Sequence, residues 1–251
     1  MLSSTFNITN AELRGRVIAA ADFPRALDFL AELATDMGFS QTLYGYIPVA
    51  PKLPNGDWMQ LRPNIRNFPK GWEFGWREFM KIDPYYRACF GSTLPIDWKE
   101  VNEDENLTPC QRKACDYLGD FGMSRGITVP VHLPFRGFAV MSFIADSSCN
   151  NWEEVRARAR EPVFRIMHVF TKLILDCSYE DQIETAQFIH LTSREKECLT
   201  WASNGKTSSE IAQILDRSVE TVRLHIKNSI SKLEATNRSQ AIANAIHLGL
   251  I

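Results

Sequence analysis

The sequence predicts two domains of different class: a mixed α+β domain in residues 1–176 and an all-α domain in residues 190–251. In the first domain, runs rich in β-branched and aromatic residues are interspersed with apolar residues at helical spacing. In the second domain, four helix-start signals follow one another in close succession. The polar stretch 177–189 lies between them and is typical of a linker. With 251 residues, the chain is long enough for two domains of ordinary size.

The elements of the first domain are predicted from their caps and spacing. Asp22 and Pro24 begin a helix whose apolar residues recur three or four positions apart until Gly38 ends it. Residues 40–49 alternate like a strand, and a second short strand is expected near Trp58, after a turn signal. The other expected elements are short helices within 68–84, helices at 109–123 and 162–174, and strands beginning at Gly126 and Gly137.

Composition narrows the class of protein. A hydrophobic content of 45% and a charged content of 23% are typical of a soluble globular protein. No apolar run approaches the roughly 18 residues of a membrane span, and the N-terminus lacks a secretion signal, so we expect a cytoplasmic protein without membrane contact. The six cysteines form no C-x-x-C pair and the five histidines complete no metal-ligand spacing. We therefore expect no metal and no cofactor.

The C-terminal segment carries sharper local signals. Thr192 with Glu195, and Thr207 with Glu210, form capping boxes, in which the hydroxyl accepts a backbone N–H and the glutamate reaches back. Ser218 caps a third helix after a join of only a few residues. Such a tight join between two short helices is typical of a helix-turn-helix.

The third helix of this segment has two faces. Val222 and Ile226 belong to an apolar stripe that predicts the face toward the core. A second face carries two long donors and an apolar side chain, namely Arg223, Leu224 and Lys227. Such a face suits base edges, phosphates and thymine methyl groups, although an ordinary amphipathic helix has a similar charged side. Residues 186–251 carry eight basic and six acidic side chains, which weakly favours nucleic acid as the partner.

Residues 191–251 closely resemble the DNA-binding domain of the LuxR family. The blocks LTSREKECL, GKTSSEIA and TVRLHIKNSISKL stand in the order and at the spacing of that family. The resemblance implies a four-helix domain with a helix-turn-helix that binds double-stranded DNA. It also implies base-edge contacts by Arg223, Leu224 and Lys227. The implied phosphate contacts are Lys206, Thr207, Thr221 and Arg238.

An aromatic-rich stretch of the first domain carries a second resemblance. Phe68-Pro69 is followed by Trp72 and Trp76, then by Asp83-Pro84, and later by Trp98. This order resembles the autoinducer-binding domain of quorum-sensing LuxR receptors, as do the segments MGFSQTLYGYIP and GITVPVH. The resemblance implies an α-β-α sandwich with an antiparallel sheet and a cavity for an N-acyl-homoserine lactone. A phosphoryl-receiver domain is not expected, because its acidic cluster and parallel α/β alternation are missing.

The resemblance also implies roles for the polar groups of that cavity. Asp83 accepts the amide N–H of the ligand, and the Trp72 indole donates to its lactone carbonyl. Ser142 is placed to bind the acyl carbonyl, and Trp98 packs against the lactone ring. The other residues expected at the site are Phe68, Trp76, Tyr85, Leu43, Gly45, Ile47 and Val140.

Two positions depart from the family pattern. Phe68 stands where many members have tyrosine, and Trp76 stands where tyrosine is usual, so two phenol hydroxyls are absent. The interval from Trp72 to Asp83 is also two residues shorter than the usual one. We expect the added bulk to shorten the acyl cavity or to favour a branched or aryl chain.

Together these features predict a ligand-responsive transcription regulator that binds an inverted repeat as a homodimer, with the helix at 162–174 partly in the dimer interface or wholly in the core. One alternative is an enzyme, but neither Ser142 nor Cys89 has a clearly paired histidine and His132 alone is weak, so we assign no catalytic residue. Another is a regulator that does not respond to a lactone, whose N-terminal domain binds a plant-derived molecule or a protein partner.

Overall fold

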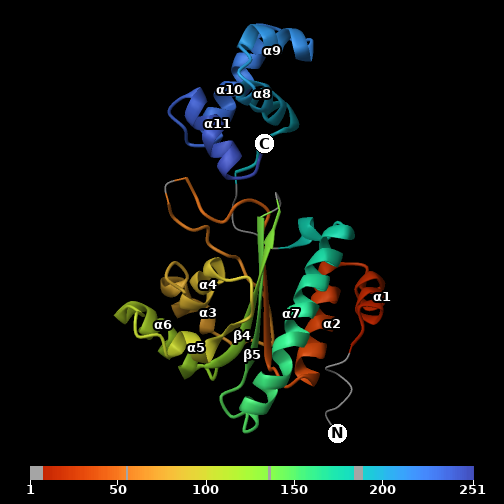
Figure 1. Cartoon of the computed structure of the whole chain (residues 1–251), viewed down its shortest axis with the longest axis vertical. Coiled ribbons are helices and arrows are strands. Elements are labelled where there is room, and N and C mark those ends of the chain that lie inside the picture. The colour runs from red at the N-terminus through yellow and green to blue at the C-terminus, as the bar shows by residue number, and fades with distance from the viewer. Residues whose placement is uncertain (1–7, 55, 135–136, 184–188) are drawn as a thin grey trace. The chain divides into compact units, whose positions relative to one another are not determined.

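The fold is described from a computed structural model, which covers residues 8–54, 56–134, 137–183 and 189–251. The chain forms two compact units, one built mainly from the residues before the linker and one mainly from those after it (Figure 1). No helix within the covered ranges is both long enough and apolar enough to cross a membrane. In the same ranges, no three His, Cys, Asp or Glu side chains lie together in a way that would hold a metal ion.

The described residues of the first unit contain a five-stranded sheet. Its strands, in their order across the sheet, are β2 (Asn64–Arg66), β1 (Gln41–Ile47), β5 (Gly137–Ala145), β4 (Arg125–Leu133) and β3 (Ile96–Asp97). The pairs β1–β2 and β3–β4 are antiparallel. β4 and β5 are buried along most of their length, because helices cover both faces of the sheet. β3, at one edge, is only two residues long.

The helices of the first unit form two layers, one on each face of the sheet (Figure 1). One layer consists of α1 (Asn10–Ala20), α2 (Phe23–Asp36) and α7 (Trp152–Asp176). The other consists of α3 (Trp72–Phe79), α4 (Pro84–Ala88), α5 (Trp98–Asn102) and α6 (Pro109–Asp120). Short 3-10 segments lie at Cys89–Gly91 and Glu180–Gln182. The predicted α-β-α sandwich is confirmed.

The two layers enclose different cores. Between the sheet and the layer of α2 and α7, aliphatic and aromatic side chains such as Leu30, Met141 and Phe170 are fully buried. In the other layer, a smaller cluster contains several indole and phenol rings, among them Trp72 and Trp98. Helices as short as α4 and α5, each of five residues, are not stable alone, so packing around these rings holds them in place.

Three elements before the linker differ from the sequence-based expectation. The sequence pattern does not reveal α1, because only Leu13 and Val17 of this helix are buried. α7 begins at Trp152, well before the predicted start at Pro162, and the proline lies inside the helix rather than in its first turn. The strand expected near Trp58 is a single bridge, and β2 lies further along the chain.

Within residues 189–251, four helices form the second unit, as predicted. They are α8 (Ser193–Ser203), α9 (Ser208–Leu215), α10 (Val219–Lys232) and α11 (Arg238–His247). Both predicted capping boxes are present, with Thr192 and Thr207 as the N-caps. Asp216 ends α9 in the left-handed conformation, with a φ of 52°, and Ser218 already caps α10. The tight turn between α9 and α10 gives the expected helix-turn-helix.

Candidate ligand cavity and DNA-binding surface

A small cavity lies in the aromatic layer of the first unit. Its volume is about 50 Å³, so its own side chains close it tightly. Of the residues predicted for the ligand site, nine line this cavity: Leu43, Phe68, Trp72, Trp76, Asp83, Tyr85, Trp98, Val140 and Ser142. Residues that are far apart in the sequence therefore converge on one site.

Two predicted wall residues do not line the cavity. A Cβ atom added at Gly45 would lie only 2.4 Å from a methyl carbon of Leu61, so the Leu61 side chain covers this glycine. Leu61 itself lines the cavity and takes the place expected for Gly45. Ile47 is buried at the end of β1 and is not part of the wall.

Five further lining residues were not predicted: Leu61, Tyr86, Leu118, Thr128 and Ile144. Strand alternation offered a signal for one of them, because Val140, Ser142 and Ile144 are every second residue of β5 and therefore share a face. Thr128 lies within the family-like GITVPVH segment. The segments that contain Leu61 and Leu118 offered no comparable signal.

Asp83 is the acidic residue of the cavity wall and the N-cap of α4. Its Oδ1 accepts the backbone N–H groups of Tyr85 and Tyr86, at 2.9 and 3.2 Å. Its Oδ2 has no hydrogen-bond partner among the described residues. Burial raises the pKa of Asp83 to about 6, and the two backbone hydrogen bonds only partly oppose that rise. One carboxylate oxygen is thus available to accept a donor within the cavity.

Trp72 supplies a donor without an acceptor. It is the first residue of α3, its side chain is buried, and its indole Nε1–H has no partner in the described part of the chain. Its ring packs against Phe68, with centroids 4.8 Å apart, and against Trp76, with centroids 6.0 Å apart. The hydroxyl of Tyr117 holds the start of α3 by donating to the Trp72 carbonyl oxygen at 2.7 Å. The indole is therefore fixed in position while its N–H is unpaired.

Trp98, by contrast, has its donor paired. Its Nε1 donates to Thr128 Oγ1 at 2.8 Å, and Thr128 Oγ1 lies 2.8 Å from Ser142 Oγ. The indole stacks on Tyr85, with centroids 4.0 Å apart. On the other side it lies close to Gly126, where a Cβ atom would come within 3.0 Å of the ring. Glycine at this position leaves the room in which the indole lies against β4.

Neither candidate nucleophile is paired with a histidine. The Ser142 hydroxyl contacts Thr128, and the Cys89 thiol donates to the Tyr85 carbonyl oxygen at 3.2 Å. Burial raises the pKa of Cys89, which disfavours the reactive thiolate. His132 Nε2 lies 3.1 and 3.0 Å from the carbonyl oxygens of Cys89 and Ser92. Neither Ser142 nor Cys89 therefore forms a nucleophile–base pair with a described histidine.

In the second unit, α10 presents the three side chains predicted to contact base edges. Arg223, Leu224 and Lys227 are exposed, and Leu224 is 55% exposed although it is apolar. Neither Arg223 nor Lys227 forms a hydrogen bond or ion pair with any described residue. On the opposite side of the helix, Val222 and Ile226 are buried in the core of this unit. The free cations are thus available to a partner.

The four residues predicted to contact phosphates lie at helix starts or near them. Thr207 caps α9, and the Lys206 ammonium lies 3.5 Å from Glu210 in the first turn of that helix. The hydroxyl of Thr221, in the first turn of α10, lies 2.9 Å from that of Ser218. Arg238 is half-buried and donates to the backbone carbonyl of Lys206. Arg238 thereby joins the start of α11 to the loop before α9.

Two family models match the chain, one in each unit. Residues 24–171 match the autoinducer binding domain, and residues 190–245 match the bacterial regulatory proteins of the luxR family. The transcriptional activator protein BjaR1 of Bradyrhizobium diazoefficiens is 28% identical over 93% of this chain and 99% of its own length. The transcriptional activator protein VanR of Vibrio anguillarum is 32% identical over 74% of this chain and 75% of its own length.

Solved structures show the same fold. A crystal structure of Escherichia coli SdiA superposes with a TM-score of 0.63 at 22% identity, over 96% of this chain and 98% of that chain. SdiA in complex with octanoyl-rac-glycerol gives a TM-score of 0.58 at 23% identity, over 100% of this chain and 93% of that chain. Both BjaR1 and VanR are named as transcriptional activators. The chain belongs to the LuxR family of regulators, with an autoinducer-binding unit followed by a DNA-binding unit.

Proposed function

We propose that this regulator binds an N-acyl-homoserine lactone, or a related small acylated signal, in the cavity of its autoinducer-binding unit. The bound signal controls how a homodimer engages an inverted repeat in promoter DNA in the cytoplasm. The proposal rests on two polar groups on the wall of one apolar cavity, the Trp72 indole N–H and the Asp83 Oδ2 atom. Neither group has a hydrogen-bond partner among the described residues.

These two groups complement the polar head of an acyl-homoserine lactone. A buried donor or acceptor without a partner costs about 1–3 kcal/mol, so a ligand that pairs it gains affinity. The amide N–H of such a ligand can donate to Asp83, and its lactone carbonyl can accept from Trp72. The acyl chain then lies among the rings and aliphatic side chains that form the rest of the wall.

The ligand-free cavity is too small for a typical small molecule. A cavity of about 50 Å³ is well below the roughly 300–1,000 Å³ of typical small-molecule sites, so the wall must move outward on binding. The short helices α3 to α5 are the part of the wall that would move, because helices of five to eight residues depend on tertiary contacts to keep their positions. Phe68 and Trp76 fill the remaining space with rings, which favours a short, branched or aryl acyl group over a long straight chain.

A signal other than a lactone also fits this chemistry. SdiA, which shares the fold, has been solved with octanoyl-rac-glycerol. The hydroxyl groups of an acylglycerol can donate to a carboxylate, and its ester carbonyl can accept from an indole, as the corresponding groups of a lactone would. The donor and acceptor on the cavity therefore define a ligand class, an acyl chain with a small polar head, rather than one compound.

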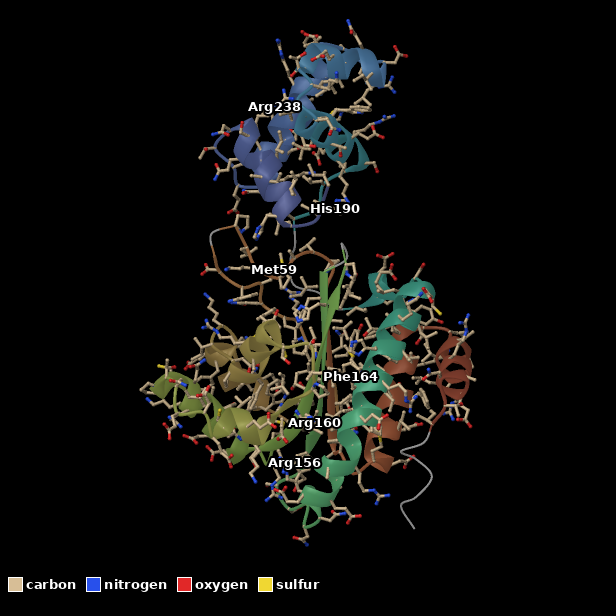
Figure 2. The ribbon with its side chains drawn as sticks, in the orientation of Figure 1. Met59, Arg156, Arg160, Phe164, His190 and Arg238 are labelled. Carbon is tan, nitrogen blue, oxygen red and sulfur yellow. The ribbon has the colours of Figure 1, made fainter. Side chains whose placement is uncertain are left out.

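The DNA-binding unit carries the output. Arg223, Leu224 and Lys227 on α10 would enter the major groove, with the helix starts around Lys206 and Thr221 near phosphates. Two copies of the unit are needed to read both halves of an inverted repeat, so the proposal includes a homodimer. We place part of α7 in the dimer interface, because its long helix has a half-buried stripe that includes Phe164 (Figure 2).

The direct test is to identify what the purified protein retains. The chain is expressed with a panel of homoserine lactones that carry butanoyl, hexanoyl, dodecanoyl and benzoyl groups, and with octanoylglycerol, and the retained compound is identified by mass spectrometry. We expect retention of at least one short-chain or aryl compound, together with a raised melting temperature. If no compound and no cell extract is retained or raises the melting temperature, the ligand-independent alternative is favoured instead.

Two pairs of matched variants test the roles of the polar groups. Asp83→Asn removes the carboxylate while keeping a good N-cap, and Asp22→Asn makes the same change at the N-cap of α2, outside the cavity. Trp72→Phe removes the indole donor, and Trp152→Phe removes a buried indole from the opposite layer. We expect only the two cavity variants to lose retention. Normal retention by both of them would contradict the assigned roles.

A further inference from the structure

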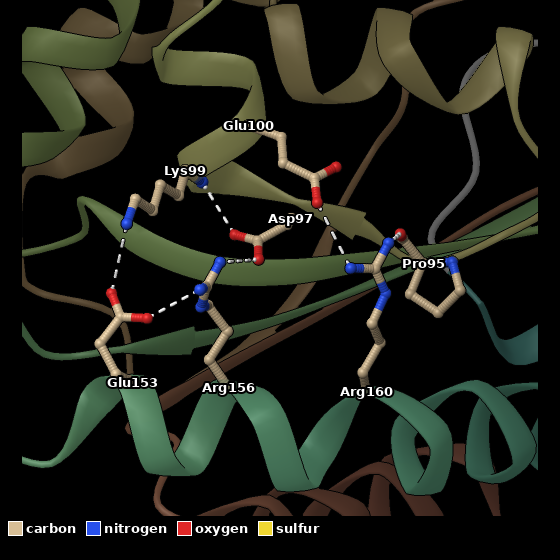
Figure 3. Close-up of polar contacts among 7 residues, drawn as sticks. All are labelled: Pro95, Asp97, Lys99, Glu100, Glu153, Arg156 and Arg160. Atoms are coloured by element: carbon tan, nitrogen blue, oxygen red, sulfur yellow. Dashed lines mark hydrogen bonds and ion pairs between the residues drawn. The ribbon is translucent and has the colours of Figure 1, made fainter.

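Side chains of α7 reach the opposite helix layer around the β3 edge of the sheet (Figure 3). Arg156 donates to Asp97 Oδ2 at 2.7 Å. Arg160 lies 3.3 Å from Glu100 and donates to the Pro95 carbonyl oxygen at 3.4 Å. These contacts connect α7 with β3 at the edge of the sheet and with α5 in the opposite helix layer (Figures 1 and 3). α5 carries Trp98, which lines the cavity. The two layers are therefore held together at this edge by charged side chains.

Only one of these ion pairs is buried. The Asp97 side chain is 4% exposed and its partner Arg156 is 28% exposed. By contrast, the Arg160–Glu100 pair is at least half exposed on both sides. Exposed pairs contribute little to geometry or stability because water competes for both charges. Loss of one member of a buried pair leaves an uncompensated charge, so the surrounding structure must rearrange.

Asp97 uses both carboxylate oxygens to hold the start of α5. Oδ1 accepts the backbone N–H of Lys99 and caps the helix at 2.9 Å, while Oδ2 accepts from Arg156. α5 has five residues and β3 has two, so neither element can hold its own position. Glu153 of α7 supports the arrangement by pairing with Arg156 at 2.7 Å and with Lys99 at 3.5 Å. The position of the next residue, Trp98, depends on these contacts.

Trp98 begins a chain of hydrogen bonds that ends at the cavity wall. An indole N–H can only donate, so Thr128 Oγ1 must be the acceptor in the 2.8 Å contact with Trp98. Thr128 can then give its own proton to Ser142 Oγ, which lies 2.8 Å away. With that direction, the proton of Ser142 is left to point into the cavity that it lines. Ser142 becomes a donor to a ligand carbonyl.

We propose that Arg156 and Asp97 are positioning residues for the ligand cavity. They hold Trp98 where its indole fixes the direction of the Thr128 and Ser142 hydroxyls, and thereby select ligands with a carbonyl oxygen opposite Ser142. The effect on ligands rests on the proposed function of the cavity. The effect on Trp98 does not, because the hydrogen bonds and the ion pair belong to the chain itself.

The first experiment needs no ligand. The indole N–H resonances of the protein are recorded by NMR after ¹⁵N-tryptophan labelling, and Trp98 is assigned with Trp98→Phe. We expect Arg156→Met to move the Trp98 resonance toward the position of an indole without a hydrogen bond. Arg158→Met is the matched control, because Arg158 lies on the same helix and its ion pair with Glu154 is exposed. An unchanged Trp98 resonance in Arg156→Met overturns the positioning role.

A milder substitution covers the case in which Arg156→Met does not fold. In Arg156→Lys the positive charge remains, but one ammonium cannot reproduce the fork that holds Asp97 and Glu153 at the same time. The Trp98 resonance should therefore move part of the way. A resonance at the wild-type position in Arg156→Lys, with Arg156→Met unfolded, counts against the proposal.

The second experiment measures affinity for N-hexanoyl-homoserine lactone by calorimetry. We expect Arg156→Met and Ser142→Ala each to weaken binding about tenfold, and the double variant to be no weaker than either, because both act on one hydroxyl. Independent effects, with a loss of about a hundredfold in the double variant, overturn the link to Ser142. Failure of the wild-type protein to bind this lactone counts against the proposed ligand class, while the NMR result still decides the positioning role.

Discussion

The two units differ in how completely their polar groups are paired. In the DNA-binding unit, the cap of every described helix accepts a backbone N–H, and buried Glu195 is paired with Lys232 at 2.7 Å. In the described residues, the buried side-chain atoms without a partner all lie in the first unit, at Gln41, Trp72 and Glu180. On the cavity wall, one carboxylate oxygen of Asp83, a partly buried residue, also has no hydrogen-bond partner among the described residues. The described helix caps of the DNA-binding unit are paired within the chain, whereas we propose that Trp72 and Asp83 of the autoinducer-binding unit gain their missing partners from a ligand.

The largest effect is expected from removing the ion-pair partner of buried Glu195 in the DNA-binding unit. Although burial raises the pKa of Glu195, hydrogen bonds from Lys232 and Thr192 hold it below its ordinary value. Lys232→Met leaves this carboxylate buried without its cation, which should cost about 3 kcal/mol of unfolding free energy. Hydrogen exchange in the full chain should then quicken in α8 and α10 and stay unchanged around the cavity.

The control for that variant is Lys206→Met. Its ion pair with Glu210 spans 3.5 Å and is exposed on both sides, so removal should change exchange very little. Equal effects of the two substitutions would show that the buried pair stabilises the DNA-binding unit no more than a surface pair does. That result would contradict the expected energetic difference between the two units.

The next effect concerns the face of α10 that we propose to contact DNA. The exposed Arg223 guanidinium has no partner among the described residues, so it is available to bind a base edge. Arg223→Ala should therefore weaken binding to an inverted repeat by about 1–3 kcal/mol per half-site. Retention of ligand should not change. Arg194→Ala removes one positive charge from α8 instead and should have a smaller effect. Fluorescence anisotropy at fixed salt measures both, and equal losses would argue against a recognition role for Arg223.

A smaller effect is expected from the unpaired donor of the autoinducer-binding unit. Trp72→Phe keeps an aromatic ring but removes the indole N–H, so ligand affinity should fall about tenfold, or 1.4 kcal/mol. The unfolding free energy of the ligand-free protein should fall by less than about 1.4 kcal/mol, because the substitution also removes a buried donor that has no partner. Calorimetry and denaturant unfolding measure the two quantities. A loss of stability larger than the loss of ligand affinity would make Trp72 a core residue rather than a ligand contact.

The smallest effect is a pH dependence set by Asp83. The pKa of about 6 belongs to the folded, ligand-free protein, and an amide N–H donated to the carboxylate would lower it. Below that pKa, binding must release a proton, so affinity should fall about fourfold from pH 7.5 to pH 5.5. Asp83→Asn should remove this dependence. Affinity that rises on acidification would contradict the proposed direction of the hydrogen bond.

The same pKa affects the ligand-free fold with the opposite trend. Because folding raises the pKa of Asp83, the folded protein binds a proton more readily than the unfolded chain between about pH 4 and pH 6. Stability of the autoinducer-binding unit should therefore decrease as the pH rises through this window and then stay level. Thermal unfolding of the wild type and Asp83→Asn across this pH range measures the change in stability, which should be smaller in the variant.

Much of this architecture was predictable from the sequence, because caps and periodicity are local. The capping boxes at Thr192 and Thr207 indicated helices of the DNA-binding unit. Most of the cavity wall was implied by the family resemblance that the aromatic residues before Asp83 carry. Residues that act through tertiary packing were not predictable in this way. Leu61 reaches the wall only because it folds over Gly45, and this contact leaves no periodic pattern in the sequence.

The hydrogen-bond partners of buried polar groups could not be predicted from the sequence either. Trp72 and Trp98 are both buried indoles in the same layer, yet one N–H is unpaired among the described residues and the other binds Thr128. Arg238 likewise donates to the Lys206 carbonyl oxygen, a contact that the sequence around it does not indicate. Such differences depend on where neighbouring elements place their acceptors, which only the folded structure specifies.

Hydrogen exchange of the full chain, with and without N-hexanoyl-homoserine lactone, tests most directly whether the autoinducer-binding unit is completed by a ligand. At a hundredfold excess over Kd, bound ligand should stabilise its unit by about 2.7 kcal/mol. We predict slower exchange in peptides from α3, α4 and α5 in the wild type, and no such change in Asp83→Asn. Equal protection of the wild type and Asp83→Asn, or no protection of these helices in the presence of a retained ligand, would contradict the central claim.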